Sequence, residues 1–238
     1  MINNIISTLD GFLHKNDYDS AKAYLLNLQK TADMQTCVFI SNELMGLYRK
    51  LGERENALNA VSTALELIQK LGIADKVGAA TTYLNSATVY KAFGLSYKSI
   101  PLFEKAKAIY ERELDSGDTR LGGLYNNMAL ALVDEKRFDE ADSLYNKALF
   151  VMANNPPELA ITYLNMASAV EAKCGLVNGD AEIQQLLDKA EKMLESHNTR
   201  DGNYAFVCEK CASVFGYYGH FAYQKELENR ARRIYEGS

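Results

Sequence analysis

Two cysteines near the end of the chain have the spacing of a redox or metal-binding motif. Cys208-x-x-Cys211 places two thiols about one helical turn apart. A redox pair needs a helix N-terminus that follows a strand, and a zinc site needs two further ligands at a matching spacing. Neither context surrounds this pair, so the favoured interpretation is two core thiols, with redox or metal chemistry as the minor alternative. We expect these and the other two cysteines, Cys37 and Cys174, to be reduced.

The remaining residues with catalytic potential form no recognisable active site. The histidines His14, His197 and His220 make no H-x-x-x-H pair, and none accompanies a nucleophile in a sharp turn. The neighbouring acids at 139–140 are expected at a helix start, where the helix dipole stabilises negative charge. The glycines of 174–180 are not followed by the lysine of a phosphate-binding loop. The sequence therefore predicts neither enzyme activity nor a cofactor.

Charge and hydropathy narrow the classes of partner. The 238 residues carry a net charge of −5, with acidic and basic side chains mixed along the chain. This pattern lacks the basic stripe of a nucleic-acid binder and the basic amphipathic helix of a membrane-surface protein. The longest apolar runs, such as 128–133, are too short to span a bilayer, and the N-terminus does not have the pattern of a secretory signal. We expect a cytoplasmic protein whose partner is another protein or a peptide.

Hydrophobic periodicity predicts an all-α chain. Apolar residues recur at intervals of three and four, and no stretch alternates with the period of a strand. The periodic segments are interrupted by short breaks in which Gly or Asn is suited to end a helix and Asp or Pro to begin one. The expected breaks are 15–17, 52–53, 71–75, 94–95, 116–118, 136–137, 154–157, 175–180, 198–202 and 219–220. The pattern predicts about twelve helices in six pairs, forming a single domain over 1–238.

An internal repeat is the strongest signal in the sequence. Segments that start at Tyr48, Tyr90 and Leu132 align without gaps at a spacing of 42 residues. Small residues recur in register within them: Ala57, Ser99 and Ala141, and then Ala64, Ala106 and Ala148. Between these two positions the segments share a larger apolar residue, which is Val61, Phe103 or Tyr145. Small side chains at fixed positions are typical of helices that cross closely.

This A-x-x-x-F/Y-x-x-A element resembles the tetratricopeptide repeat, in the longer variety found in kinesin light chains. One extra turn on each helix accounts for most of the difference from the usual ~34 residues. The resemblance is clear over 37–195, weaker over the C-terminal capping repeat at 203–238, and weakest over a divergent hairpin at 1–32. It implies a right-handed α-α superhelix, a tetratricopeptide solenoid. HEAT repeats have a similar length but lack this spacing of alanine and aromatic residues.

The resemblance also implies that the first helix of each pair lines a concave groove. Asn85, Asn127 and Asn165 recur on that face, and asparagines there hold the ligand backbone in peptide-binding members of the family. An asparagine amide can donate and accept together. The alternative is that these asparagines only brace neighbouring helices. The other candidate peptide-binding residues are Arg49, Lys50, Lys91, Leu84, Leu130 and Leu164, and further groove-facing positions include Asn42, Asn126, Ile161, Glu171, Lys210 and Tyr217.

Two aromatic features receive different interpretations. Tyr83, Tyr125 and Tyr163 recur at a position that packs inside the helical hairpin, so we expect them in the core. The aromatic-rich segment 217–224 instead belongs to the last hairpin, where exposed rings favour contact with a second copy. A peptide- or protein-binding scaffold is thus the leading hypothesis, and a structural module that forms a homodimer through a terminal hairpin is the alternative.

Overall fold

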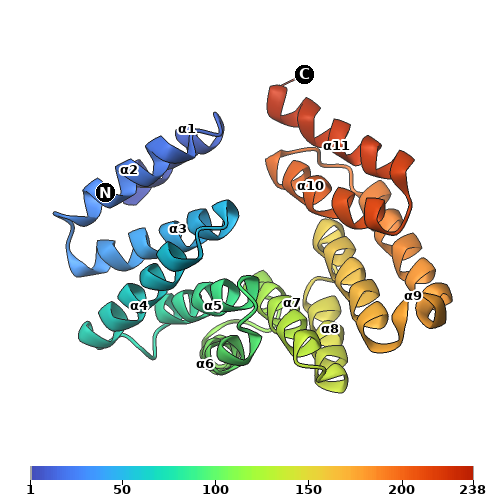
Figure 1. Ribbon diagram of the computed structural model, residues 1–238, viewed down its shortest axis with the longest axis horizontal. Coiled ribbons are helices and arrows are strands. Elements are labelled where there is room, and N and C mark those ends of the chain that lie inside the picture. Colours follow the sequence, from blue (N-terminus) through green and yellow to red (C-terminus); the bar gives the residue numbers. More distant parts are fainter. Residues whose placement is uncertain (1, 238) are drawn as a thin grey trace. The chain divides into compact units, whose positions relative to one another are not determined.

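The computed structural model describes residues 2–237, which form eleven helices and no strand (Figure 1). In chain order these helices are α1 (Ile2–Leu13), α2 (Tyr18–Gln29), α3 (Met34–Leu51), α4 (Arg54–Lys70), α5 (Val77–Ala92), α6 (Ser96–Glu113), α7 (Thr119–Asp134), α8 (Phe138–Val151), α9 (Pro156–Ser196), α10 (Gly202–Tyr217) and α11 (Phe221–Glu236). The predicted all-α class is confirmed. Within the described part of the chain, no helix combines the length and the apolar character needed to cross a bilayer.

The longest helix contains a reversal at one residue. Gly175 in α9 has φ 81° and ψ 164°, far from helical values, so α9 consists of two helices that form a hairpin. The expected loop at 174–180 is therefore wrong in extent, because the second helix resumes directly after Gly175. Gly179 helps to explain why no longer loop is needed. A Cβ there would lie only 2.9 Å from a Val170 side-chain carbon, so the two segments approach at a glycine.

Every hairpin turns at a residue with positive φ. These residues are Asn16, Gly52, Gly94, Lys136, Gly175 and Gly219, with φ between 53° and 90°. In the left-handed conformation the chain can bond back onto the last turn of the preceding helix, as when the Glu53 amide donates to the Tyr48 carbonyl at 2.9 Å. Glycine adopts this conformation without strain. Lys136 adopts it at a cost, because its Cβ comes close to a backbone carbonyl oxygen. The repeat thus preserves the backbone geometry even where glycine is absent.

The small residues of the repeat lie where the helices cross. The set Ala57, Ser99, Ala141, Ala64, Ala106 and Ala148 is fully buried, as are Val61, Phe103 and Tyr145 between them. Tyr83 and Tyr125 are buried and Tyr163 is half-buried against the core, as expected. A lysine of the following helix lies over each ring, with Lys105, Lys147 and Lys189 at 5.5, 5.4 and 5.8 Å from the ring centroids. These lysines are also 42 residues apart, so the cation–π contact belongs to the repeat.

The chain divides into two compact units, one up to Leu114 and one from Asp115. The first contains α1–α6, with a core that includes Leu25, Ile40 and Leu44, and α3 contacts both α4 and α5. The second contains α7–α11, with a core that includes Leu187 and Phe215, and α9 contacts α7, α8 and α10. The first helices α3 and α5 of the first unit are therefore neighbours, as are α7 and α9 of the second, which is the arrangement that the groove prediction requires.

Candidate functional site

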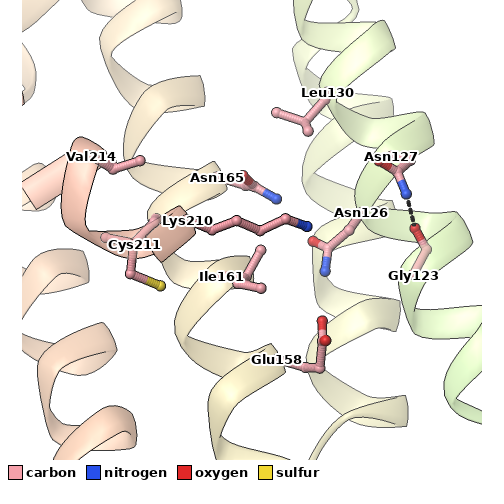
Figure 2. Close-up of a pocket in the computed structure, with 11 residues that line it drawn as sticks. Gly123, Asn126, Asn127, Leu130, Glu158, Ile161, Asn165, Lys210, Cys211 and Val214 are labelled. Carbon is pink, nitrogen blue, oxygen red and sulfur yellow. Dashed lines mark hydrogen bonds between the residues drawn. The ribbon is translucent and has the colours of Figure 1, made fainter. Parts of the chain in front are cut away.

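A cavity of about 300 Å³ lies among the first helices of the second unit. Its walls come from α7, the first segment of α9, and α10 (Figure 2). The lining residues are Gly123, Asn126, Asn127, Leu130, Glu158, Ile161, Leu164, Asn165, Lys210, Cys211 and Val214. Four of the nine predicted peptide-binding residues, Asn127, Asn165, Leu130 and Leu164, thus line one cavity. Leu164 is a buried part of its floor, at 2% exposure, while the other three are half-buried.

The buried wall of the cavity contains an unsatisfied hydrogen-bond acceptor. Asn126 is 5% exposed, and its side-chain nitrogen donates to the Thr162 hydroxyl at 2.8 Å. Its side-chain oxygen, Oδ1, is buried and accepts no hydrogen bond from any described residue. A buried acceptor without a donor typically costs about 1–3 kcal/mol. The cavity therefore contains a group that gains free energy when a donor reaches it.

The two predicted ladder asparagines of this unit have different environments. Asn127 donates its side-chain nitrogen to the Gly123 carbonyl of its own helix at 2.8 Å, which leaves its side-chain oxygen as an acceptor. Asn165 has no side-chain hydrogen bond to any residue of the described 2–237. Figure 2 shows its amide pointing from α9 toward α7. Asn165 can therefore both donate to and accept from a group that enters the cavity.

Two charged side chains of opposite sign flank these amides. Burial raises the pKa of the Glu158 carboxyl, and the nearby positive charge of Lys210 opposes that shift. The Lys210 ammonium also lies 4.4 Å from the centroid of the Phe206 ring, on the same helix. Figure 2 shows Lys210 extending from α10 toward α7 across the cavity. The formal charges of the two groups cancel, so the cavity is polar without a strong net field.

Cys211 of the Cys208-x-x-Cys211 pair lines this cavity. Cys208 and Cys211 are 0% and 1% exposed, and both are free thiols in the core of the second unit. Burial raises the pKa of Cys208 to about 11 and raises that of Cys211 further. Both thiols are therefore protonated and poorly nucleophilic at neutral pH. Among the described residues, no group of three or more His, Cys, Asp or Glu side chains is placed to hold a metal ion.

The predicted site residues of the first unit lie on α3 and α5. Asn85 donates its side-chain nitrogen to the side-chain oxygen of Asn42 at 2.9 Å, and Asn42 donates in turn to the Thr82 hydroxyl at 3.0 Å. Asn85 therefore braces two neighbouring first helices, as the alternative interpretation of the ladder proposed. The ammonium of Lys50 lies 4.9 Å from the centroid of the Tyr18 ring. Leu84 and Lys91 are half-buried, and Arg49 is exposed in the last turn of α3.

The charged cavity residue Glu158 was not predicted from the sequence, and neither was the hydrogen bond between Glu171 and Tyr217. Glu158 lies in the first turn of α9. Its carbonyl accepts a hydrogen bond from the Thr162 hydroxyl at 2.9 Å, which ties it to Asn126. Glu171 and Tyr217, both expected in the groove, are hydrogen-bonded to each other at 2.5 Å. A signal was present, because Asn126 and Thr162 repeat the register of the asparagine and threonine of the first unit.

Comparison with known proteins shows where the fold occurs elsewhere. The family model described as the tetratricopeptide repeat matches residues 81–154. No curated protein sequence matches the chain. The crystal structure of BtubC (BKLC) from P. vanneervenii is similar, with a TM-score of 0.67 at 18% identity over 83% of this chain and 82% of that chain. A Podosopora anserina protein described as a putative kinesin light chain with nearly identical TPR-like repeats gives 0.53 at 19% identity, over 82% and 92%. A variant of that protein with one substitution gives 0.56 at 18% identity, over 85% and 96%.

Proposed function

We propose that this chain, a tetratricopeptide repeat protein, is a non-enzymatic interaction module that holds a peptide segment of a partner protein in the cavity among α7, α9 and α10. Tetratricopeptide scaffolds generally mediate contacts between proteins, and their helices rarely contribute catalytic groups. The observation that carries the proposal is the cavity itself. It combines an orphaned buried acceptor, an unpartnered amide and aliphatic side chains on neighbouring first helices.

The chemistry of the cavity suits a peptide better than a metal ion or a small anion. A peptide offers N–H donors, C=O acceptors and apolar side chains together, and the lining offers a match for each. Asn126 and Asn127 provide acceptors, and Asn165 provides a donor. Leu130 and Ile161 provide half-buried apolar surface. A volume of about 300 Å³ is at the low end for ligand pockets, which fits the entry of one or two side chains from an extended segment.

Selection from a random peptide library displayed on phage tests this proposal. The full chain is the bait, and the affinities of enriched peptides are then measured for the wild type and for the double variant Asn127→Ala/Asn165→Ala. The affinity is expected to fall by about tenfold or more, since two groups that pair with the ligand are lost. Neither asparagine bonds another helix, so circular dichroism should show unchanged folding.

Asn146→Ala is the matched control, because this asparagine is exposed on α8, which contributes no residue to the cavity. It should bind every enriched peptide as the wild type does. Failure to enrich any peptide, or equal affinity of the wild type and the double variant, would refute the proposal.

Self-association through the last hairpin is a second candidate function, favoured by two exposed rings. Phe221 is 70% exposed and Tyr217 is 65% exposed, although the Tyr217 hydroxyl is bonded to Glu171. If these rings form a homodimer contact, Tyr217→Ser/Phe221→Ser should halve the mass measured by light scattering. A wild type that is monomeric at all concentrations measured would end this candidate.

A further inference from the structure

The molecule contains the same asparagine pair twice, once in each unit. Asn42 and Asn126 occupy equivalent repeat positions 84 residues apart, and both donate to a threonine on the next first helix. Asn85 and Asn165 are also equivalent, as members of the asparagine ladder. Asn42 with Asn85 in the first unit therefore corresponds to Asn126 with Asn165 in the second.

In the first unit this pair is closed. The Asn42 side-chain oxygen accepts from the Asn85 side-chain amide at 2.9 Å. A carboxamide thus satisfies the acceptor, while the other end of Asn42 remains bonded to Thr82. The first unit thus shows that a carboxamide can pair with an asparagine whose nitrogen is bonded to a threonine hydroxyl.

In the second unit the pair is open. The Asn126 side-chain oxygen is buried without a donor, and the Asn165 amide has no hydrogen-bonded partner in the described chain. Both residues line the same cavity of about 300 Å³. The direct asparagine–asparagine hydrogen bond of the first unit is therefore absent in the second, where both residues belong to the lining of a cavity.

The orientation of Asn126 is fixed by its neighbour. The Thr162 hydroxyl has one proton, which it donates to the Glu158 carbonyl at 2.9 Å. The hydroxyl can then only accept from Asn126, so the Asn126 nitrogen faces Thr162 and its oxygen is turned away from it. An entering group must donate a hydrogen bond to satisfy that oxygen.

The surrounding charges restrict the kind of donor. A carboxylate cannot donate at neutral pH. An ammonium or guanidinium donates but has no acceptor for the Asn165 amide N–H, and Lys210 repels it in the same cavity where Glu158 attracts it. A primary carboxamide has no charge, donates through its NH₂ group to Asn126, and accepts through its oxygen from Asn165. The side chain of Ile161 lines the same cavity and offers an apolar contact for methylene groups.

Space and access are compatible with a side chain of this size. A cavity of about 300 Å³ is at the low end of the range for ligand pockets and is large enough for one glutamine side chain. Because the side-chain oxygen of Asn126 is sealed from solvent, a neighbouring side chain must move for a ligand to reach it. Lys210 is long and flexible, and Figure 2 shows it across the cavity, so it is the side chain placed to move.

We infer that the cavity recognises a side-chain carboxamide, an asparagine or glutamine of the partner, which takes the place between Asn126 and Asn165 that Asn85 takes on Asn42. This inference rests on the proposed function, because the carboxamide is presented by the bound peptide. It goes further because it assigns the chemical class of the anchoring residue and the two side chains that bind it, those of Asn126 and Asn165.

The test uses peptides enriched from the displayed library on the full chain. They are expected to share one Gln or Asn position, and its replacement by Glu or Met should weaken binding to the wild type about tenfold or more. In a double-mutant cycle, the same replacement should have little further effect on the variants Asn126→Leu and Asn165→Ala. Asn126→Leu also removes the hydrogen bond to Thr162 and could disturb the fold. Asn165→Ala removes no internal hydrogen bond, so the test remains decisive with that variant alone.

The possible failures are distinguishable. Enriched peptides that lack a shared carboxamide, or whose carboxamide shows no coupling to Asn165, would overturn this inference and leave the proposed function standing. Such a result would point to recognition of the peptide backbone. A library from which nothing is enriched would overturn both.

Discussion

The side chain of Asn85 is hydrogen-bonded to that of Asn42, with 2.9 Å between nitrogen and oxygen, whereas the equivalent asparagines of the second unit are not bonded to each other. The same residue types at the same repeat positions therefore have two states, closed and open. A closed pair joins neighbouring helices and should contribute to stability. An open pair leaves its hydrogen-bonding groups to a ligand and should contribute little.

Alanine substitutions should separate these two roles. Asn85→Ala removes the donor to Asn42 and is expected to lower the free energy of unfolding by about 0.5–1.5 kcal/mol, the net contribution of one hydrogen bond. Asn165→Ala removes no hydrogen bond and should change it by less than about 0.5 kcal/mol. Urea unfolding followed by circular dichroism measures both. Equal losses in the two variants would mean that the second pair also closes in solution.

The hairpin turn at Lys136 offers a stabilising substitution. Lys136 has φ 59°, in a turn where the equivalent Gly52 and Gly94 have 72° and 73°. A left-handed conformation costs a non-glycine residue about 1–2 kcal/mol, part of which is offset by the greater freedom of glycine in the unfolded chain. Lys136→Gly should therefore raise the free energy of unfolding by about 0.5–1 kcal/mol, while Gly52→Ala should lower it by about 1 kcal/mol. A thermal melt in which Lys136→Gly lowers the midpoint would contradict this account.

The fold could be predicted from the sequence because the repeat constrains it at many positions. Ala57 and Ala141 must be small wherever two helices cross, and they are fully buried as that argument requires. The extent of a break is harder to predict, because it depends on contacts between segments. A single glycine at 175 reverses the chain where a loop over 174–180 was expected, since the glycine at 179 lets the two segments approach closely.

The candidate site could be predicted only as a set of positions. The ladder placed Asn127 and Asn165 on the face that contains the cavity, but sequence alone could not separate Asn85, which is bonded across helices, from Asn165, which is not. That difference depends on the distance between two side chains on neighbouring helices, and a repeat pattern specifies only the face. The orientation of Asn126 likewise depends on the hydrogen bond from its nitrogen to Thr162 on the neighbouring helix, which the repeat pattern does not specify.

Removing the buried hydroxyl of Tyr145 in α8 is expected to leave the protein as stable as the wild type or more stable. Tyr145 is fully buried, and its hydroxyl has no hydrogen-bond partner among the described residues. Tyr145→Phe removes the unsatisfied group and keeps the ring, so stability should be unchanged or higher by up to about 1 kcal/mol. Tyr204→Phe is the matched control, because the Tyr204 hydroxyl accepts from Arg230 at 3.0 Å. It should lower stability by about 1 kcal/mol in the same urea titration, and a comparable loss in Tyr145→Phe would show that its hydroxyl is satisfied in solution.

Thiol labelling should distinguish core cysteines from a reactive pair. Cys174 is exposed, whereas Cys208 and Cys211 are buried with raised pKa values, about 11 for Cys208. An aromatic disulfide reagent at neutral pH should label Cys174 rapidly and the buried pair only after addition of denaturant, because the reaction requires an accessible thiolate. The variant Cys174→Ser should abolish the rapid phase. Rapid labelling of two thiols in that variant would revive the redox or metal interpretation of Cys208-x-x-Cys211.

The start of α7 should make stability sensitive to acid. Asp118 accepts from the backbone amide of Arg120 at 3.0 Å, and the Arg120 guanidinium bonds both carboxylate oxygens, at 2.9 and 2.5 Å. The guanidinium contact first, and the backbone contact second, lower the pKa of Asp118 from 3.8 to about 2.

The sign of the effect follows from that shift. Since the folded pKa is depressed, the unfolded chain takes up the proton first as the pH falls, so the stabilisation is complete above about pH 4 and is lost between about pH 4 and pH 2. Asp118→Asn keeps an acceptor at the cap but removes the charge. The wild type should be more stable than the variant by about 1 kcal/mol at neutral pH, after allowance for the solvent exposure of this ion pair. The difference in free energy of unfolding should stay constant from about pH 7 to 4 and then shrink. Urea titrations of both proteins across this range measure the difference directly, and a gap that stays constant down to about pH 2 would show that the Arg120 contact does not perturb the carboxyl in solution.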